Sequence, residues 1–150
     1  MTAELGREHL ARPGDAAWSR RLSRHGEIVR EGLLRFDGRL IKMIGDGALG
    51  TFSGPARAVS AASSILEALG SEGLEARAGI HVGEVELEGD DIAGLAVHIA
   101  ARVMGEARGG EILVSRTVRD LTAGSGLEFT ERGRHALKGI PDEWELYALS

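Results

Sequence analysis

The chain has 150 residues, a length that fits one domain with one hydrophobic core, and its 43% apolar and 27% charged residues exclude a disordered or low-complexity protein. Its 18 basic and 23 acidic side chains give a net charge of −5, so no basic field would hold it on nucleic acid or on an anionic membrane. It has no cysteine, no apolar run long enough to span a membrane and no signal-peptide start, so we expect a cytoplasmic protein without disulfides or thiolate metal sites.

Helix and strand patterns alternate in the first half of the chain. Apolar residues at helical spacing predict a helix from Asp15 to Phe36, whose interior glycines allow a kink or a break. Two short strands, 40–44 and 48–52, flank an Asp-Gly pair, which predicts a hairpin with Asp46 at its turn. A proline-led helix follows from 55 to 70.

The second half continues this alternation to the end of the chain. The predicted elements are a β-rich stretch at 76–88, a helix at 95–107, a strand at 111–115, a short helix at 116–122 and closing strands at 127–132 and 144–149. Several hairpins among alternating strands and helices predict an α+β fold, with helices covering a mostly antiparallel sheet. No linker interrupts the pattern, so we expect residues 1–150 to form a single domain.

The most specific feature of the sequence is a series of blocks that span roughly Glu8 to Leu149. The blocks are Gly38–Phe52, Ala78–Val85, Asp91–Arg102, Gly110–Ser115 and Gly133–Ile140. In this order they closely resemble the catalytic domain of class III adenylyl and guanylyl cyclases. The resemblance implies a ferredoxin-like βαβ sandwich of the nucleotide cyclase type. The best-known members join a ribose 3′-hydroxyl to the α-phosphate of a nucleoside triphosphate and release pyrophosphate, at two sites on the interface of a head-to-tail dimer.

Asp46 falls on one of the two aspartates that hold a pair of magnesium ions in the resembled family. Hard divalent cations such as Mg²⁺ and Mn²⁺ prefer carboxylate oxygens, and a hairpin tip lets both oxygens and nearby carbonyls face one point. The alternative is an aspartate that only shapes its turn, because Asp-Gly is common in turns.

Lys42 and Asp91 fall on the two base-reading positions of the resembled family. An ammonium group can donate to adenine N1 while a carboxylate accepts from the N6 amino group, whereas guanine presents the opposite pattern. The pair therefore predicts ATP as the nucleotide. A snorkelling strand lysine and a loop aspartate are the alternatives.

Three further residues match phosphate or ribose positions of the family. Arg102 matches the arginine that stabilises charge on the reacting phosphate, and its alternative is a surface pair with Glu106 one turn along the helix. His98 shares a helical face with Arg102 and stands where most active relatives have asparagine. Lys138 matches a lysine that contacts the triphosphate, although a solvated surface lysine is equally consistent with its position. The other histidines, His81 and His135 among them, show no metal-ligand spacing and are expected to be strand or surface residues.

The first seven residues depart from the family pattern. Family domains open with a central strand that ends in the other metal aspartate, and an ungapped extension places Thr2 at that position. Residues 1–7 are short and polar for a buried strand, so we expect the opening strand and one metal carboxylate to be missing. A sheet with this gap should be poorly stable alone or should associate with another chain.

These observations leave three hypotheses. In the first, the chain is an adenylate cyclase-like domain that dimerises and binds ATP, with an impaired metal site. In the second, it is a working adenylate cyclase that was truncated or assigned a late start. In the third, it is a regulatory partner that forms a heterodimer with a complete cyclase.

Overall fold

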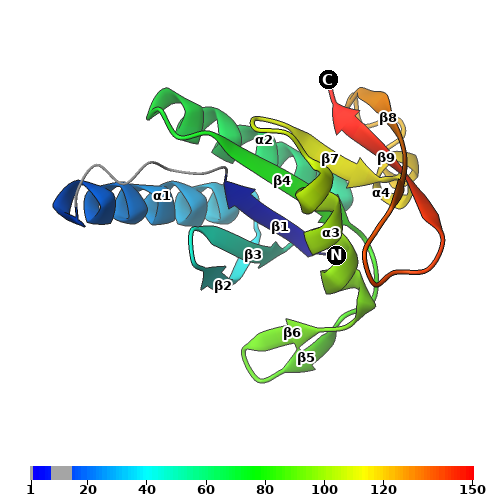
Figure 1. Cartoon of the computed structure of the whole chain (residues 1–150), viewed down its shortest axis with the longest axis horizontal. Coiled ribbons are helices and arrows are strands. Elements are labelled where there is room, and N and C mark those ends of the chain that lie inside the picture. The colour runs from blue at the N-terminus through cyan, green and yellow to red at the C-terminus, as the bar shows by residue number, and fades with distance from the viewer. Residues whose placement is uncertain (1, 8–14) are drawn as a thin grey trace.

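A computed structural model of the chain describes residues 2–7 and 15–150 (Figure 1). The elements in chain order are β1 (Thr2–Arg7), α1 (Asp15–Arg35), β2 (Arg39–Ile44), β3 (Gly47–Thr51), α2 (Pro55–Ser71), β4 (Ala76–His81), β5 (Glu86–Glu88), β6 (Asp91–Ala93), α3 (Leu95–Glu106), β7 (Ile112–Ser115), α4 (Arg116–Leu121), β8 (Phe129–Ala136) and β9 (Glu143–Leu149). None of the helices in these residues is long and apolar enough to cross a membrane.

A seven-stranded sheet in the order β2-β3-β1-β4-β7-β9-β8 forms the centre of the domain. All neighbouring strands are antiparallel except β4 and β7, which are parallel. The predicted α+β fold, with helices covering a mostly antiparallel sheet, is therefore confirmed.

Helices cover both faces of this sheet. Along β7 the side chains alternate, so that Ile112 and Val114 join the core under α1 and α2 while Leu113 joins the core under α3. The helix α1 runs unbroken, and its Gly32 faces Ile65 of α2 so closely that a Cβ there would overlap the isoleucine side chain. The interior glycine thus lets two helices pack closely and does not break the first.

The expectation that the opening strand is missing is wrong. Thr2–Arg7 forms β1, which pairs antiparallel with β3 on one side and with β4 on the other. Without it, both neighbours would present unpaired N–H and C=O groups, and pairing on both sides outweighs the weak strand propensity of this polar segment. The gap from which we expected low stability or association is filled by the chain's own residues.

The register of β1 also corrects the position given to Thr2. Thr2 lies opposite Thr51, whereas Leu5 lies opposite Ala48, so β1 runs toward the turn that holds Asp46. Thr2 is therefore at the end of the strand away from Asp46. Residues 8–14, which follow β1, lie outside the described part of the chain.

A separate hairpin of β5 and β6 extends from the body of the domain (Figure 1). We call residues 86–93 the arm. The predicted β-rich stretch, 76–88, includes β5 but not β6. The alternation of Glu and apolar residues that predicts a strand ends at Glu88, so the sequence did not predict the second strand of the arm. The arm places Asp91 at the start of its returning strand.

Candidate functional site

Lys42 and Asp91 meet between the edge of the sheet and the arm. The Lys42 Nζ lies 2.9 Å from the Asp91 Oδ2, although the two residues are 49 positions apart in the chain. The other carboxylate oxygen of Asp91 accepts a bond of 2.8 Å from the Ile92 N–H. The hydrogen bond from Lys42, followed by that from the Ile92 backbone, lowers the pKa of Asp91 below its ordinary value. The fold thus brings together the two residues predicted to read the base.

Asp46 lies in the turn between β2 and β3, as predicted. Gly45 before it has a positive φ of 57°, a conformation that glycine adopts without strain, and the Asp46 side chain is half-buried. Among the described residues, no group of three or more His, Asp or Glu side chains gathers in a way that could hold a metal ion. Asp46 could therefore supply one carboxylate to a divalent cation at this turn.

The helix α3 presents His98 and Arg102 on its exposed face. Its opposite face packs against β4 at Gly79, where an added Cβ would overlap the backbone N of Met104 and lie 2.6 Å from the Ala100 carbonyl oxygen. Only glycine allows this close approach, which fixes the height of α3 over the sheet. The two exposed side chains are therefore carried by a rigid support.

Arg102 does not form an ion pair with Glu106, which was the alternative role considered for it. The Glu106 Oε2 lies 3.2 Å from the His135 Nδ1 on β8. Within residues 2–7 and 15–150, no hydrogen bond or ion pair engages the Arg102 guanidinium, which is left available for a ligand.

Lys138 lies exposed in the connection between β8 and β9. The preceding Leu137 is buried with Ile99 and Val103 of α3, so this connection is fixed against the same helix that carries His98 and Arg102. The structure thus pairs Lys42 with Asp91 and places His98 with Arg102 on the exposed face of α3, while Lys138 and Asp46 lie each in its own connection.

One buried polar pair was not anticipated from the sequence. The His81 Nδ1 lies 2.7 Å from the Ser115 Oγ, and the imidazole packs edge-on to the Trp144 ring, with 5.4 Å between centroids. His81 is only 6% exposed, and this burial lowers its pKa to about 4. The apolar neighbours of His81 in the sequence indicated a strand, but nothing indicated its partner on β7.

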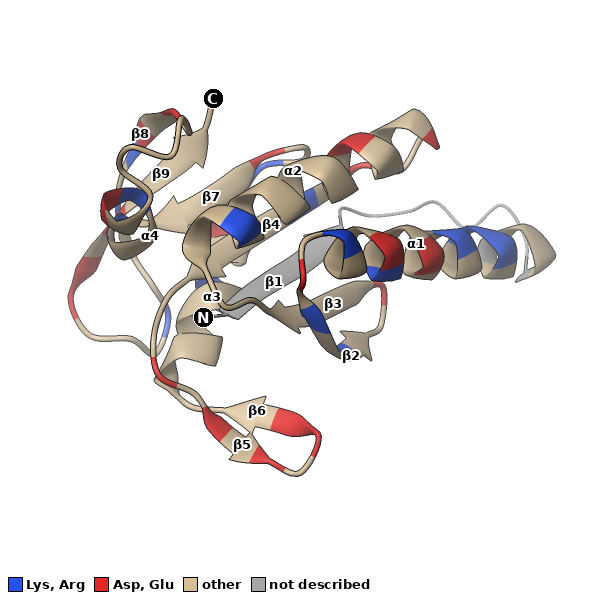
Figure 2. Ribbon diagram, turned by 180° about the vertical axis from the view of Figure 1, so that it is seen from behind, with Lys and Arg blue, Asp and Glu red and all other residues tan. Residues whose placement is uncertain are grey.

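Charged residues are unevenly distributed over the surface (Figure 2). The arm and the residues just before it carry Glu84, Glu86, Glu88, Asp90 and Asp91, and no Lys or Arg occurs between Arg77 and Arg102. A triphosphate would therefore be repelled by the arm and attracted toward the cations at Arg102 and Lys138.

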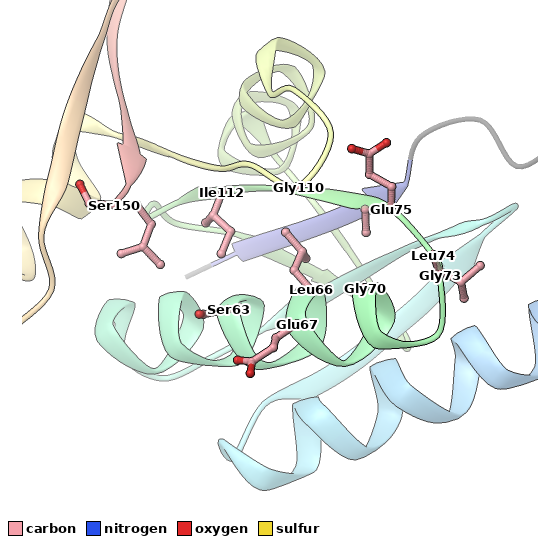
Figure 3. A pocket seen from close by; sticks show the side chains of 12 residues that line it. Ser63, Leu66, Glu67, Gly70, Gly73, Leu74, Glu75, Gly110, Ile112 and Ser150 are labelled. Carbon is pink, nitrogen blue, oxygen red and sulfur yellow. The ribbon is translucent and has the colours of Figure 1, made fainter.

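The pocket drawn in Figure 3 lies elsewhere, between α2, the starts of β4 and β7, and the end of β9. It has a volume of about 470 Å³. Its apolar lining includes Leu66 and Ile112, and its charged residues are Glu67 and Glu75, which would repel an anion. No predicted site residue lines it, so it is not the candidate nucleotide site.

Residues 28–150 match the family model described as "Adenylate and Guanylate cyclase catalytic domain". Among curated proteins, the chain is 26% identical over 128 residues to "Putative adenylate cyclase 3" of Rhizobium meliloti, covering 79% of this chain and 22% of that protein. It is 37% identical over 86 residues to an uncharacterized protein of Mycobacterium tuberculosis, covering 56% of this chain and 23% of that protein. The chain thus spans less than a quarter of the length of these relatives.

Solved structures resemble the whole chain. An adenylate/guanylate cyclase/hydrolase from Silicibacter pomeroyi is 25% identical, with a TM-score of 0.86 over 99% of this chain and 95% of that one. The catalytic core of a rhodopsin-guanylyl cyclase with converted specificity, in complex with ATPαS, is 19% identical, with a TM-score of 0.89 over 99% of this chain and 93% of that one. At that identity the second likeness shows the fold alone.

Proposed function

The chain belongs to the adenylate and guanylate cyclase catalytic domain family, and we propose that it binds ATP as an adenylate cyclase-like domain. The observation that carries this proposal is the 2.9 Å contact between Lys42 and Asp91. It places a donor and an acceptor side by side, which is what the Watson–Crick edge of adenine requires. The Lys42 ammonium would donate to N1, and the Asp91 carboxylate would accept from the N6 amino group.

Guanine would be rejected by the same pair. Its O6 accepts and its N1–H donates, so each position of the purine edge meets the wrong partner. A site that forms a hydrogen bond with one ligand leaves its own polar groups unpaired when a mismatched ligand binds. ATP should therefore bind at least about tenfold more tightly than GTP, as expected for one unsatisfied hydrogen bond.

The cations on and beside α3 would bind the phosphates. A guanidinium remains protonated and donates in a planar fork, so Arg102 suits the α-phosphate on which charge develops during cyclisation. Lys138 would contact the outer phosphates. His98 would donate one hydrogen bond to the ribose at the position where most active relatives have asparagine.

Cyclisation itself forms a bond from the ribose O3′ to the α-phosphorus as O3′ loses its proton, and breaks the bond from that phosphorus to the oxygen it shares with the β-phosphate, releasing pyrophosphate. Members of the family use divalent metals, and Asp46 would be the ligand that this chain contributes to Mg²⁺ or Mn²⁺. Because the sequence has no aspartate before Asp15 that could join Asp46 in a two-ion site, we propose that turnover is weak. A chain that binds ATP without turning it over would serve as a partner of a complete cyclase, which is the second candidate function.

We also propose that the chain dimerises, either with itself or with another cyclase domain. The arm exposes Leu87, and the start of α3 exposes Leu95, so apolar surface is available beside the site.

Binding can be tested by calorimetry with ATP and GTP in the presence of Mg²⁺. We expect ATP to be preferred, and we expect Lys42→Glu to abolish that preference while the protein remains folded. Arg57→Glu provides a control, since Arg57 pairs with Asp37 on the surface and not with any of the predicted site residues. Equal affinities for ATP and GTP in the unsubstituted protein would refute the proposed base recognition.

Turnover can be tested separately by measuring cyclic AMP formation with Mg²⁺ or Mn²⁺. We expect little or no product. Robust turnover that is lost in Asp46→Asn would show that the metal site is complete and that the chain is a working cyclase.

A further inference from the structure

The end of α3 that follows Arg102 is held by two residues of β8. The Arg132 Nη2 donates to the Glu106 carbonyl oxygen at 3.3 Å, while its Nε and Nη2 bind the two carboxylate oxygens of Glu111 at 2.7 and 3.1 Å. The Glu106 side chain lies 3.2 Å from His135, as described above. Both the backbone and the side chain of the last residue of α3 are therefore engaged by β8.

Glu106 would otherwise be a competitor for Arg102. The two residues stand at i and i+4 of one helix, where opposite charges pair. Glu106 also occupies the last turn of α3, where a negative charge is unfavourable beside the helix C-terminus and gains from a nearby cation. Either Arg102 or a protonated His135 can provide this cation, and in the structure His135 is the residue that contacts Glu106.

His135 makes one hydrogen bond and one ion-pair contact, and together they favour a particular protonation state of its ring. Its Nε2 lies 2.7 Å from the Arg132 carbonyl oxygen, and its Nδ1 lies 3.2 Å from the Glu106 carboxylate. Neither oxygen can donate, so Nε2 carries the proton of the shorter hydrogen bond, and the 3.2 Å contact with the Glu106 carboxylate is an ion pair only in the imidazolium, in which Nδ1 also carries a proton. In a neutral ring that keeps the shorter bond, the Nδ1 lone pair would face the carboxylate.

We propose that His135 is a positioning residue for Arg102: by binding the Glu106 carboxylate, protonated His135 keeps the Arg102 guanidinium unpaired for the phosphates of the nucleotide. When His135 loses its proton, Glu106 is released and turns toward Arg102. It then neutralises the guanidinium and places a second negative charge beside the phosphate. This inference rests on the phosphate-binding role proposed for Arg102.

Among residues 2–7 and 15–150, the ionisable side chain in contact with His135 is that of Glu106. The other contact is with the backbone carbonyl of Arg132, whose guanidinium pairs with Glu111. The cross-strand neighbour of His135 on β9 is Trp144, which carries no charge. The side chains of His135 and Glu106 are 22% and 40% exposed, so protons can reach the pair from solvent.

The test compares His135→Leu, Glu106→Gln and the double variant. The probe is a non-hydrolysable ATP analogue with Mg²⁺, titrated by calorimetry at pH 6. We expect His135→Leu to weaken binding about two- to fivefold, since an exposed i, i+4 pair is weak but the released carboxylate also repels phosphate. Removing the carboxylate in the double variant should restore the affinity, which would not happen if His135 only stabilised the fold.

Raising the pH should reproduce the effect in the unsubstituted protein. Its affinity should fall as His135 deprotonates, whereas Glu106→Gln should show a flatter profile. A double variant that binds as weakly as His135→Leu, or identical pH profiles for the two proteins, would overturn the inference.

A measurement without nucleotide separates this inference from the proposed function. The Nε–H signal of Arg102 in ¹⁵N NMR spectra reports pairing of the guanidinium. We expect slower solvent exchange of this proton in His135→Leu and normal exchange in the double variant. If the protein binds no analogue at all, the proposed function fails, and the Arg102 signal still decides whether His135 controls the Arg102–Glu106 pair.

Discussion

At the scale of single residues, the burial and the contacts of His81, His135 and the Lys42–Asp91 pair differ. His81 is enclosed by the core and faces Ser115 and Trp144, whereas His135 lies at the surface between two acceptors. Lys42 and Asp91 are both about half exposed. Burial favours the neutral form of His81 and lowers its pKa.

The Lys42–Asp91 pair can be examined without any nucleotide. Because the bond from Lys42 is the main cause of the lowered pKa of Asp91, we expect this pKa to rise toward its ordinary value in Lys42→Met. Carboxyl NMR titration measures it directly. The thermal midpoint should change little, because exposed ion pairs contribute little to stability. An unchanged Asp91 titration would show that Ile92 alone holds the carboxylate.

Acid should destabilise the protein through His81. Its folded pKa of about 4 lies below the ordinary 6.5, so the unfolded chain takes up a proton first as the pH falls. The contribution of His81 to the free energy of unfolding is complete above pH 6.5 and is lost as the pH falls from 6.5 to about 4. This loss is about 3 kcal/mol at most. Urea unfolding at several pH values should show this loss in the unsubstituted protein and a smaller one in His81→Asn.

At the scale of elements, the contact between α3 and β4 positions the exposed face of the helix. We expect Gly79→Ala to cost about 2 kcal/mol or more, because its methyl group would overlap the helix backbone at Met104. Gly105→Ala on the same helix is the matched control, since a Cβ there meets nothing within 4 Å and alanine favours helix. Chemical denaturation measures both, and equal stability of the two variants would contradict the close packing.

At the scale of the whole molecule, the exposed arm is the part best placed to meet another chain. Leu87 in the arm is 76% exposed, and Leu34 on α1 is 75% exposed. If the arm supports the proposed dimer, Leu87→Glu should shift sedimentation toward the monomer without lowering the thermal midpoint, while Leu34→Glu should not. A protein that sediments as a monomer at high concentration before substitution would refute self-association and leave pairing with another domain.

Local patterns in the sequence were sufficient for most elements of the fold. The helices α1, α2 and α3 followed from apolar residues at helical spacing, and the β2–β3 hairpin followed from Asp-Gly between two short strands. These signals are local because helix periodicity and turn chemistry involve residues within a few positions of one another. The family blocks added the roles expected of Lys42, Asp91 and Arg102, which stay predictions until binding is measured.

Tertiary structure decided the features that depend on distant segments. The polar residues of β1 do not indicate a central strand, and its formation follows from the two neighbours whose backbone groups it satisfies. The sequence also left open whether Glu106 pairs with Arg102 or with another cation. That choice depended on β8 bringing His135 to the end of α3, a contact between residues 29 positions apart that no local pattern specifies.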